Sequence, residues 1–209
     1  MMKRIVLMSL LALALPLAAF ADSPVDFTNS AGTLSGSSAG LTLTGSELVV
    51  VNGLNGGGLL TGNMGTVSFT TGAETSALPL TGSATFAAGG TFTITGNGTN
   101  GVPNGTIFAG TFSGPVTWSH FSPASGLNQY TLSGQISGTW YNGATVSGVT
   151  IQVTTNTGKG GFTGSAILGS GDTDITVSTA PTVPEPGTLG LLGTGLIGIA
   201  GALRRKLKV

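Results

Sequence analysis

The chain has 209 residues, a length that suits one domain plus short targeting segments. Charged residues make up only 7% of it, and between residues 22 and 183 a single lysine faces six acidic residues, a net charge of −5. So acidic a segment cannot neutralise a phosphate backbone, which excludes nucleic acid as a partner. The absence of cysteine excludes disulfides, thiolate metal sites and cysteine nucleophiles.

Residues 1–21 have the three parts of a secretory signal peptide. Lys3 and Arg4 precede a short apolar run, and Ala19 and Ala21 place small side chains at the −3 and −1 positions of a cut after residue 21. The alternative is a retained N-terminal helical anchor, but the run is short for a membrane span. We therefore expect cleavage after Ala21 and export of the remaining chain.

Residues 22–180, rich in glycine, threonine and serine, alternate between apolar and polar side chains. In QYTLSGQISGTWY, residues 129–141, Leu132, Ile136 and Trp140 share one face, and threonine, serine and glutamine occupy the other. Disordered chains do not alternate this regularly, and no window has a convincing helical period. The pattern predicts further strands at residues 41–44, 66–70, 91–95, 106–121, 149–154 and 174–178.

The expected fold class of this region is all-β. Roughly eight to eleven antiparallel strands would form either a β-sandwich or an up-and-down barrel. Glycines that alternate with large residues, as in Leu132-Gly134-Ile136, are typical of a tightly curved sheet. Asn142-Gly143 predicts a hairpin turn of type I′. A β-solenoid would need a fixed repeat, which we do not find, and an outer-membrane barrel would not need the C-terminal anchor described below.

Three features of this region contain residue types used in catalysis or phosphate binding, but each lacks the context that such chemistry needs. Residues 36–40, GSSAG, match G-x-S-x-G without a strand-to-helix turn to expose Ser38 as a nucleophile. His120 has no carboxylate near it in sequence, which favours a structural role. Lys159, between two glycines, lacks the other residues of a phosphate-binding loop and suits a hairpin tip.

Four carboxylates are candidates for paired chemistry. Asp172 and Asp174 would help to bind calcium, but two are too few for a site, and a polar turn before the last strand is the favoured interpretation. Glu47 and Glu74 would serve as a glycosidase pair only if the fold brings them together. We therefore assign no catalytic residue, no metal site and no cofactor.

Aromatic side chains are the candidates for sugar stacking. Trp118 and Trp140 fall on the apolar faces of their strands and are expected in the core, whereas Phe121 and Tyr141 fall on the opposite faces. A surface carbohydrate-binding module that uses Phe121 and Tyr141 is therefore the main alternative function. A secreted hydrolase is the third hypothesis.

The C-terminal part predicts a linker followed by a membrane anchor. In residues 181–187 the motif Pro184-Glu185-Pro186 keeps the chain extended and accessible. Residues 188–209 predict one transmembrane helix with a basic tail that stays in the cytoplasm by the positive-inside rule. The basic residues of this tail are Arg204, Arg205, Lys206 and Lys208.

A stripe of small residues runs along the predicted transmembrane helix at intervals of four. Such a stripe lets another helix approach closely in lipid. The alternative is that small residues merely fill a weak anchor. The stripe consists of Gly190, Thr194, Gly198 and Ala202.

This combination of Pro-Glu-Pro, a short glycine-rich apolar helix and a terminal Arg-Arg-Lys closely resembles the PEP-CTERM sorting signal of Gram-negative bacteria. The resemblance implies recognition by an exosortase, a multi-pass transpeptidase-like enzyme, and cleavage near the motif. It also implies delivery to the cell surface or to an extracellular polysaccharide matrix. We therefore expect an exported, non-enzymatic protein whose precursor is anchored in the inner membrane with the β-domain outside the cytoplasm.

Overall fold

A computed structural model describes residues 24–76, 80–123 and 126–177 of the chain. The predicted signal peptide, proline-rich linker, transmembrane helix and basic tail lie outside these residues. The elements are β1 (Pro24–Ser30), β2 (Thr33–Ser37), β3 (Gly40–Asn52), the 3₁₀ turn η2 (Leu54–Gly56), β4 (Leu60–Thr61), β5 (Gly65–Thr70), β6 (Ala84–Phe86), β7 (Gly89–Asn97), β8 (Asn104–Phe112), β9 (Val116–Phe121), β10 (Asn128–Trp140), β11 (Thr145–Gly158), β12 (Ser165–Ile167) and β13 (Ser170–Thr176). Within the described ranges, the structure contains no helix long and apolar enough to cross a membrane.

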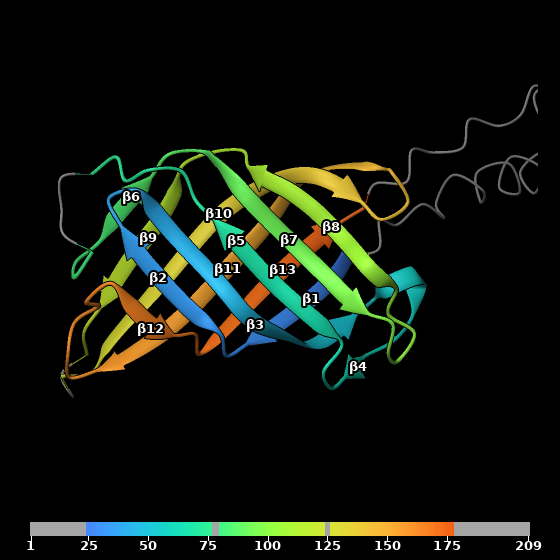
Figure 1. Ribbon diagram of the computed structural model, residues 1–209, viewed down its shortest axis with the longest axis horizontal. Helices are drawn as coiled ribbons and strands as arrows, with labels where there is room; N and C mark the ends of the chain where they lie inside the picture. Colours follow the sequence, from blue (N-terminus) through green and yellow to red (C-terminus); the bar gives the residue numbers. More distant parts are fainter. Residues whose placement is uncertain (1–23, 77–79, 124–125, 178–209) are drawn as a thin grey trace, which may run out of the picture. The chain divides into compact units, whose positions relative to one another are not determined.

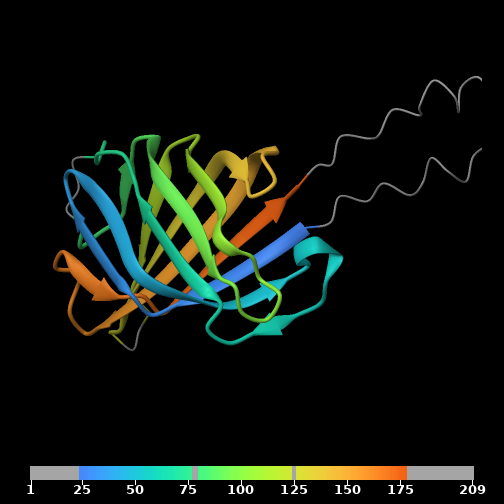
Figure 2. The same cartoon turned by 45° about the vertical axis from the view of Figure 1, so that its right-hand side comes forward.

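The strands form a closed antiparallel barrel (Figures 1 and 2). The order around the wall is β1, β13, β11, β10, β8, β7, β5 and β3, and β3 pairs again with β1. The first and last strands close the wall, with Pro24 opposite Thr176. The structure thus confirms the all-β prediction and, of its two alternatives, has the barrel. The strands run obliquely to the long axis in Figure 1, as the closure of a barrel requires.

Several short strands are pieces of one longer wall strand. β2 pairs with the first part of β3 and β1 with its second part, so β1 and β2 follow one line with a break between them. At this break Ala31 and Gly32 have positive φ values of 58° and 78°. A Cβ on Gly32 would lie 2.5 Å from the backbone nitrogen of Ser46, so only glycine fits there. The pairs β6 and β7, β8 and β9, and β12 and β13 likewise each follow one line of the wall. When each such pair is taken as one long strand, strands that are neighbours in the wall are also successive in the sequence.

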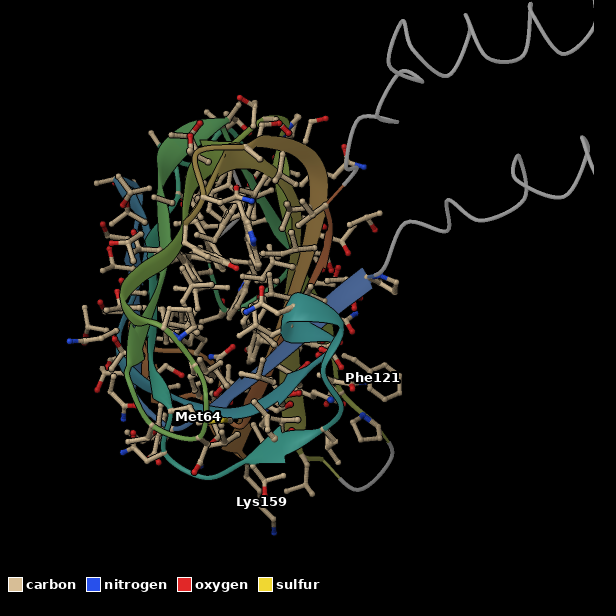
Figure 3. The ribbon with its side chains drawn as sticks, turned by 90° about the vertical axis from the view of Figure 1, so that its right-hand side faces the viewer. Met64, Phe121 and Lys159 are labelled. Atoms are coloured by element: carbon tan, nitrogen blue, oxygen red, sulfur yellow. The ribbon has the colours of Figure 1, made fainter. Side chains whose placement is uncertain are left out.

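The core fills the inside of the barrel (Figure 3). Side chains of one parity on each strand point inward, as the period of two predicts, and Trp118 and Trp140 are buried among them. In β10, a Cβ on Gly134 would lie 2.9 Å from the ring of Phe112, and one on Gly138 would lie 2.2 Å from the carbonyl oxygen of Ala109. The glycines of this strand therefore make room for an aromatic ring and for a close approach to β8.

The hairpin between β10 and β11 differs from the predicted type I′ turn. The amide of Gly143 donates to the carbonyl oxygen of Trp140, and the amide of Trp140 donates to the carbonyl oxygen of Ala144. Gly143 has a φ of 88°, while Asn142 is not among the residues with positive φ. The loop thus has three residues and ends in a left-handed glycine, a common alternative for Asn-Gly hairpins.

The two ends of the barrel are closed differently. At one end, the terminal mouth, lie Pro24, Thr176 and the connection between β10 and β11. At the opposite end, the far mouth, Tyr130 donates to the carbonyl oxygen of Thr81 (2.9 Å) and accepts from the amide of Phe162 (3.0 Å). These bonds hold two loops over the aromatic side chains at the far mouth, so that end of the barrel is plugged.

Candidate functional site

Three carboxylates meet on the outer face of the barrel where its first and last strands join. Asp26 on β1 lies directly opposite Asp174 on β13, and Asp172 faces Thr28, two residues further along β1. One carboxylate oxygen from each aspartate lies within 4.8 Å of the others. The three side chains point outward because Phe27, Thr173 and Ile175, of the opposite parity, point into the core.

The proximity of these carboxylates changes their acidity. Burial raises the pKa of Asp26 from 3.8 to about 6, helped by a hydrogen bond with Asp172 and by the charges of Asp172 and Asp174. Burial and the charge of Asp172 also raise the pKa of Asp174. One oxygen of Asp26, Oδ1, is buried and has no hydrogen-bond partner among the described residues. The cluster therefore concentrates negative charge that its surroundings do not neutralise.

A polar groove lies beside this cluster on the outer wall. Its volume is about 540 Å³, and it extends from Gly114 and Pro115 across β10 and β11 to β13. Gly114 and Pro115 belong to a bulge between β8 and β9, because Phe112 pairs with Ile136 whereas Thr117 pairs with Ser133. The bulge forms one wall of the groove, and the carboxylates of Asp172 and Asp174 form the other.

The strand register arranges the polar side chains of the groove in two parallel rows across β10, β11 and β13. Each row contains one hydroxyl, one amide and one carboxylate, and neighbouring members lie about 4.8 Å apart, the usual distance between strands. The first row is Ser133, Gln152 and Asp172, and the second is Gln135, Thr150 and Asp174. The arrangement offers donors and acceptors beside a negative edge, which suits a hydroxylated or cationic ligand.

The structure corrects the expected position of Asp172 and Asp174. Both lie inside β13 instead of in a polar turn before it. The reason is that Gly171, Thr173 and Ile175 continue the inward parity of the strand, so the aspartates are its outward residues. Sequence reasoning also missed Asp26, because only the pairing of the first strand with the last brings it to the other two aspartates.

The two glutamates considered as a glycosidase pair have no acidic partner across their strands. Glu47 on β3 faces Ser30 on β1 and Thr66 on β5. Glu74 forms an isolated bridge with Phe86, and its carboxylate accepts a hydrogen bond from Ser76 (3.2 Å). Neither belongs to the carboxylate cluster.

The other candidates are found in structural positions. Ser38 lies in the tight turn between β2 and β3, not in a strand-to-helix turn. His120 stacks on Tyr130 with ring centres 4.7 Å apart, and its Nε2 is 2.7 Å from the side-chain oxygen of Asn128. Lys159 is exposed after β11 and points away from the barrel (Figure 3). These positions agree with the roles expected of the histidine and the lysine.

The exposed aromatic residues do not form one platform. Phe121 is 63% exposed and Tyr141 is 42% exposed, as their strand parity predicts. However, Phe121 ends β9 at the far mouth, whereas Tyr141 follows β10 at the terminal mouth, where its hydroxyl donates to Asn55. Phe121 and Tyr141 therefore cannot stack on the same sugar unit.

The remaining candidates, which concern sorting, lie outside the described residues. They are the cleavage-site residues Ala19 and Ala21, the motif Pro184-Glu185-Pro186, the small residues Gly190, Thr194, Gly198 and Ala202, and the basic residues Arg204, Arg205, Lys206 and Lys208. They remain predictions about individual residues. For the segment that contains the last three groups, comparison with known families supplies a separate observation.

Residues 182–206 match the family described as the PEP-CTERM protein-sorting motif. The match confirms the resemblance noted in the sequence, and it includes the Pro-Glu-Pro motif, the apolar segment and the first three basic residues that follow it. The chain matches neither a curated protein nor a solved structure. The chain therefore carries a recognised sorting motif behind a barrel for which these comparisons provide no relative.

Proposed function

We propose that the chain is an exported, non-enzymatic protein that an exosortase-type enzyme sorts to the cell surface or extracellular matrix. The observation that carries the proposal is the sorting motif at residues 182–206. It lies at the C-terminus of a chain that begins with the features of a secretory signal peptide, and both features concern export.

The precursor has one topology under this proposal. The signal peptide directs residues from 22 onward out of the cytoplasm, and the apolar segment before Arg204 stops in the inner membrane. Pro184, Glu185 and Pro186 then lie between the barrel and the membrane, where a membrane-embedded enzyme would reach them. Cleavage there would release the barrel from its basic tail.

The barrel suits the role of an exported passenger. Closure removes the unpaired sheet edges through which β-proteins aggregate. Its first and last strands meet at the terminal mouth, with Pro24 opposite Thr176.

The intact mass of the protein in each cell fraction of its native host tests this proposal. We expect the mature protein to lack the residues that follow the Pro-Glu-Pro region and to leave the inner-membrane fraction. Replacing Pro184 and Pro186 by alanine should leave the precursor in the membrane. Pro181→Ala, just outside the matched residues, is the control and should be processed normally.

Two results would contradict the sorting proposal. A protein that keeps Arg204 to Val209 and stays in the membrane fraction would show that the tail is only an anchor. Normal processing of the Pro184→Ala, Pro186→Ala variant would show that the motif is not what the enzyme recognises. Either result would overturn the sorting role.

A further inference from the structure

We propose that the polar groove on the barrel wall binds an amino sugar, a hydroxylated ring that carries a free ammonium group. This inference goes beyond the sorting role and does not depend on it, because it rests on residues of the barrel wall and on none of the matched residues 182–206. The groove volume of about 540 Å³ lies within the range of small-molecule sites, about 300–1,000 Å³.

The lining of the groove disfavours anionic ligands. Pro115 is its one exposed apolar side chain, since Ile151 is 2% exposed, and none of its residues is aromatic. It contains two carboxylates and no cationic side chain, so an anion would meet repulsion without compensation. The polar interactions that this lining offers a ligand are therefore hydrogen bonds and attraction for a positive charge.

The side chains that remain can supply such bonds. Gln135, Thr150 and Gln152 are exposed, and within the described part of the chain no hydrogen bond occupies their side-chain atoms. An amide donates and accepts, and a hydroxyl does both as well, which matches the neighbouring hydroxyls of a sugar ring. Two rows of such groups cross the three strands that line the groove.

Each row ends in a carboxylate, so a ligand that reaches this end of the groove should carry a positive charge. Asp172 and Asp174 line the groove, and Asp26 on the neighbouring strand β1 is paired with Asp174. Lys159, the single lysine or arginine in the described part of the chain, lies after β11 and is not part of the groove. An ammonium group at this edge would make charge-assisted hydrogen bonds and relieve the repulsion among the three carboxylates.

Calorimetric titration of the full-length chain, purified in detergent, tests the inference. The probes are a glucosamine tetramer, with four free amines, and its fully N-acetylated counterpart, which has the same rings without the charge. We expect the free-amine tetramer to bind at least about tenfold more tightly. The double variant Asp172→Asn, Asp174→Asn should lose that preference, and Gln152→Ala should weaken binding of both tetramers.

Two controls separate recognition from general effects. Thr93→Ala, on β7 outside the groove, should leave binding unchanged, and each variant should keep the wild-type circular dichroism spectrum and melting temperature to within a few degrees. Tetralysine tests whether charge alone is sufficient. If tetralysine binds as tightly as the glucosamine tetramer and Gln152→Ala has no effect, the groove does not recognise the sugar ring. If the two tetramers bind equally tightly, or if neither binds, the groove does not recognise an ammonium group and the proposal is wrong.

These results are independent of sorting, which is measured on the processed protein in the cell. A chain that is cleaved and released but binds neither tetramer retains its sorting role and loses the groove proposal. A chain that binds the free-amine tetramer but keeps its tail supports the groove proposal and contradicts the sorting role.

Discussion

Closure of the barrel places Asp26 where its charge opposes those of two neighbours. Like charges directly opposite each other in a sheet destabilise it, and Asp26 and Asp174 are such a pair at the join that closes the wall. Below about pH 6, protonation of Asp26 partly offsets this repulsion. At the scale of single residues, the stability of the barrel therefore depends on the protonation of this cluster.

The free energy of unfolding should decrease as the pH rises through 6. The pKa of Asp26 rises from 3.8 to about 6 on folding, so the folded chain holds this proton more tightly than the unfolded chain does. Its stabilising contribution is fully present below about pH 4 and is lost as the pH rises through the folded value. Between about pH 4 and pH 7, the wild type should lose about 1 kcal/mol relative to Asp26→Asn, since partial exposure reduces the effect.

Urea unfolding followed by tryptophan fluorescence measures this difference. Both tryptophans, Trp118 and Trp140, are buried in the barrel, so the signal reports on this domain even in the full-length chain. The comparison between wild type and Asp26→Asn cancels the contributions of the titrating groups that do not interact with Asp26. If the two stability curves stay parallel across this pH range, folding does not raise the pKa of Asp26.

A second residue-scale prediction concerns the glycines of β10. Gly138→Ala would place a methyl group 2.2 Å from the carbonyl oxygen of Ala109, too close for any L side chain without a shift of β8 or β10. We expect a loss of about 2–4 kcal/mol in the free energy of unfolding. Gly58→Ala is the matched control, because a Cβ there meets no atom within 4 Å and its φ is not positive. Equal stability of the two variants would contradict the close approach of these strands.

At the scale of elements, the local pattern predicts strands well and their interruptions less well. The run from Gln129 to Tyr141 appears as β10, one residue earlier at each end. Residues 106–121 were expected to be continuous, but Ser113, Gly114 and Pro115 separate β8 from β9. Proline has no amide to donate to a neighbouring strand, so a bulge at Pro115 was predictable from the residue itself.

The loops over the far mouth depend on one tyrosine hydroxyl. Tyr130→Phe removes a bond to Thr81 and one from the amide of Phe162, and it leaves that buried amide without its partner. We expect a loss of about 1–3 kcal/mol and faster hydrogen exchange at Phe162. Tyr141→Phe is the control, because its hydroxyl bonds to Asn55 at an exposed site and should matter by less than about 0.5 kcal/mol. Unchanged hydrogen exchange at the amide of Phe162 would show that packing alone holds the two loops at the far mouth.

At the scale of the whole molecule, the sequence left sandwich and barrel open for a physical reason. Alternation specifies which face of a strand is buried, but it does not specify which strands are neighbours. The decisive contact joins β1 to β13, at opposite ends of the domain, and nothing in the pattern of Pro24–Ser30 identifies its partner. The carboxylate cluster was missed for the same reason, whereas the sorting motif was found because it is local.

Closure also makes the barrel tolerant of circular permutation. Residues 22–178 form one compact unit whose described ends, Pro24 and Val177, lie side by side in the pairing of β1 with β13. A short glycine-serine linker can therefore join them, and the chain can be opened between Ser38 and Ala39, in the exposed turn between β2 and β3. The linker turns β13 and β1 into a hairpin. The pair of β2 and β3, which is a hairpin in the natural order, then joins the two new chain ends and closes the wall.

The permutation exchanges one closing pair for another, so the average sequence separation of contacts stays nearly the same. We expect the permuted barrel to keep the folding rate within about tenfold of the unpermuted barrel and the stability within about 2 kcal/mol. Stopped-flow fluorescence and urea unfolding measure the two quantities. Opening the chain instead between Val67 and Ser68, inside β5 and next to a fully buried side chain, should prevent folding. A permutant opened at Ser38 that fails to fold would show that the order of strand pairing, not closure alone, determines this barrel.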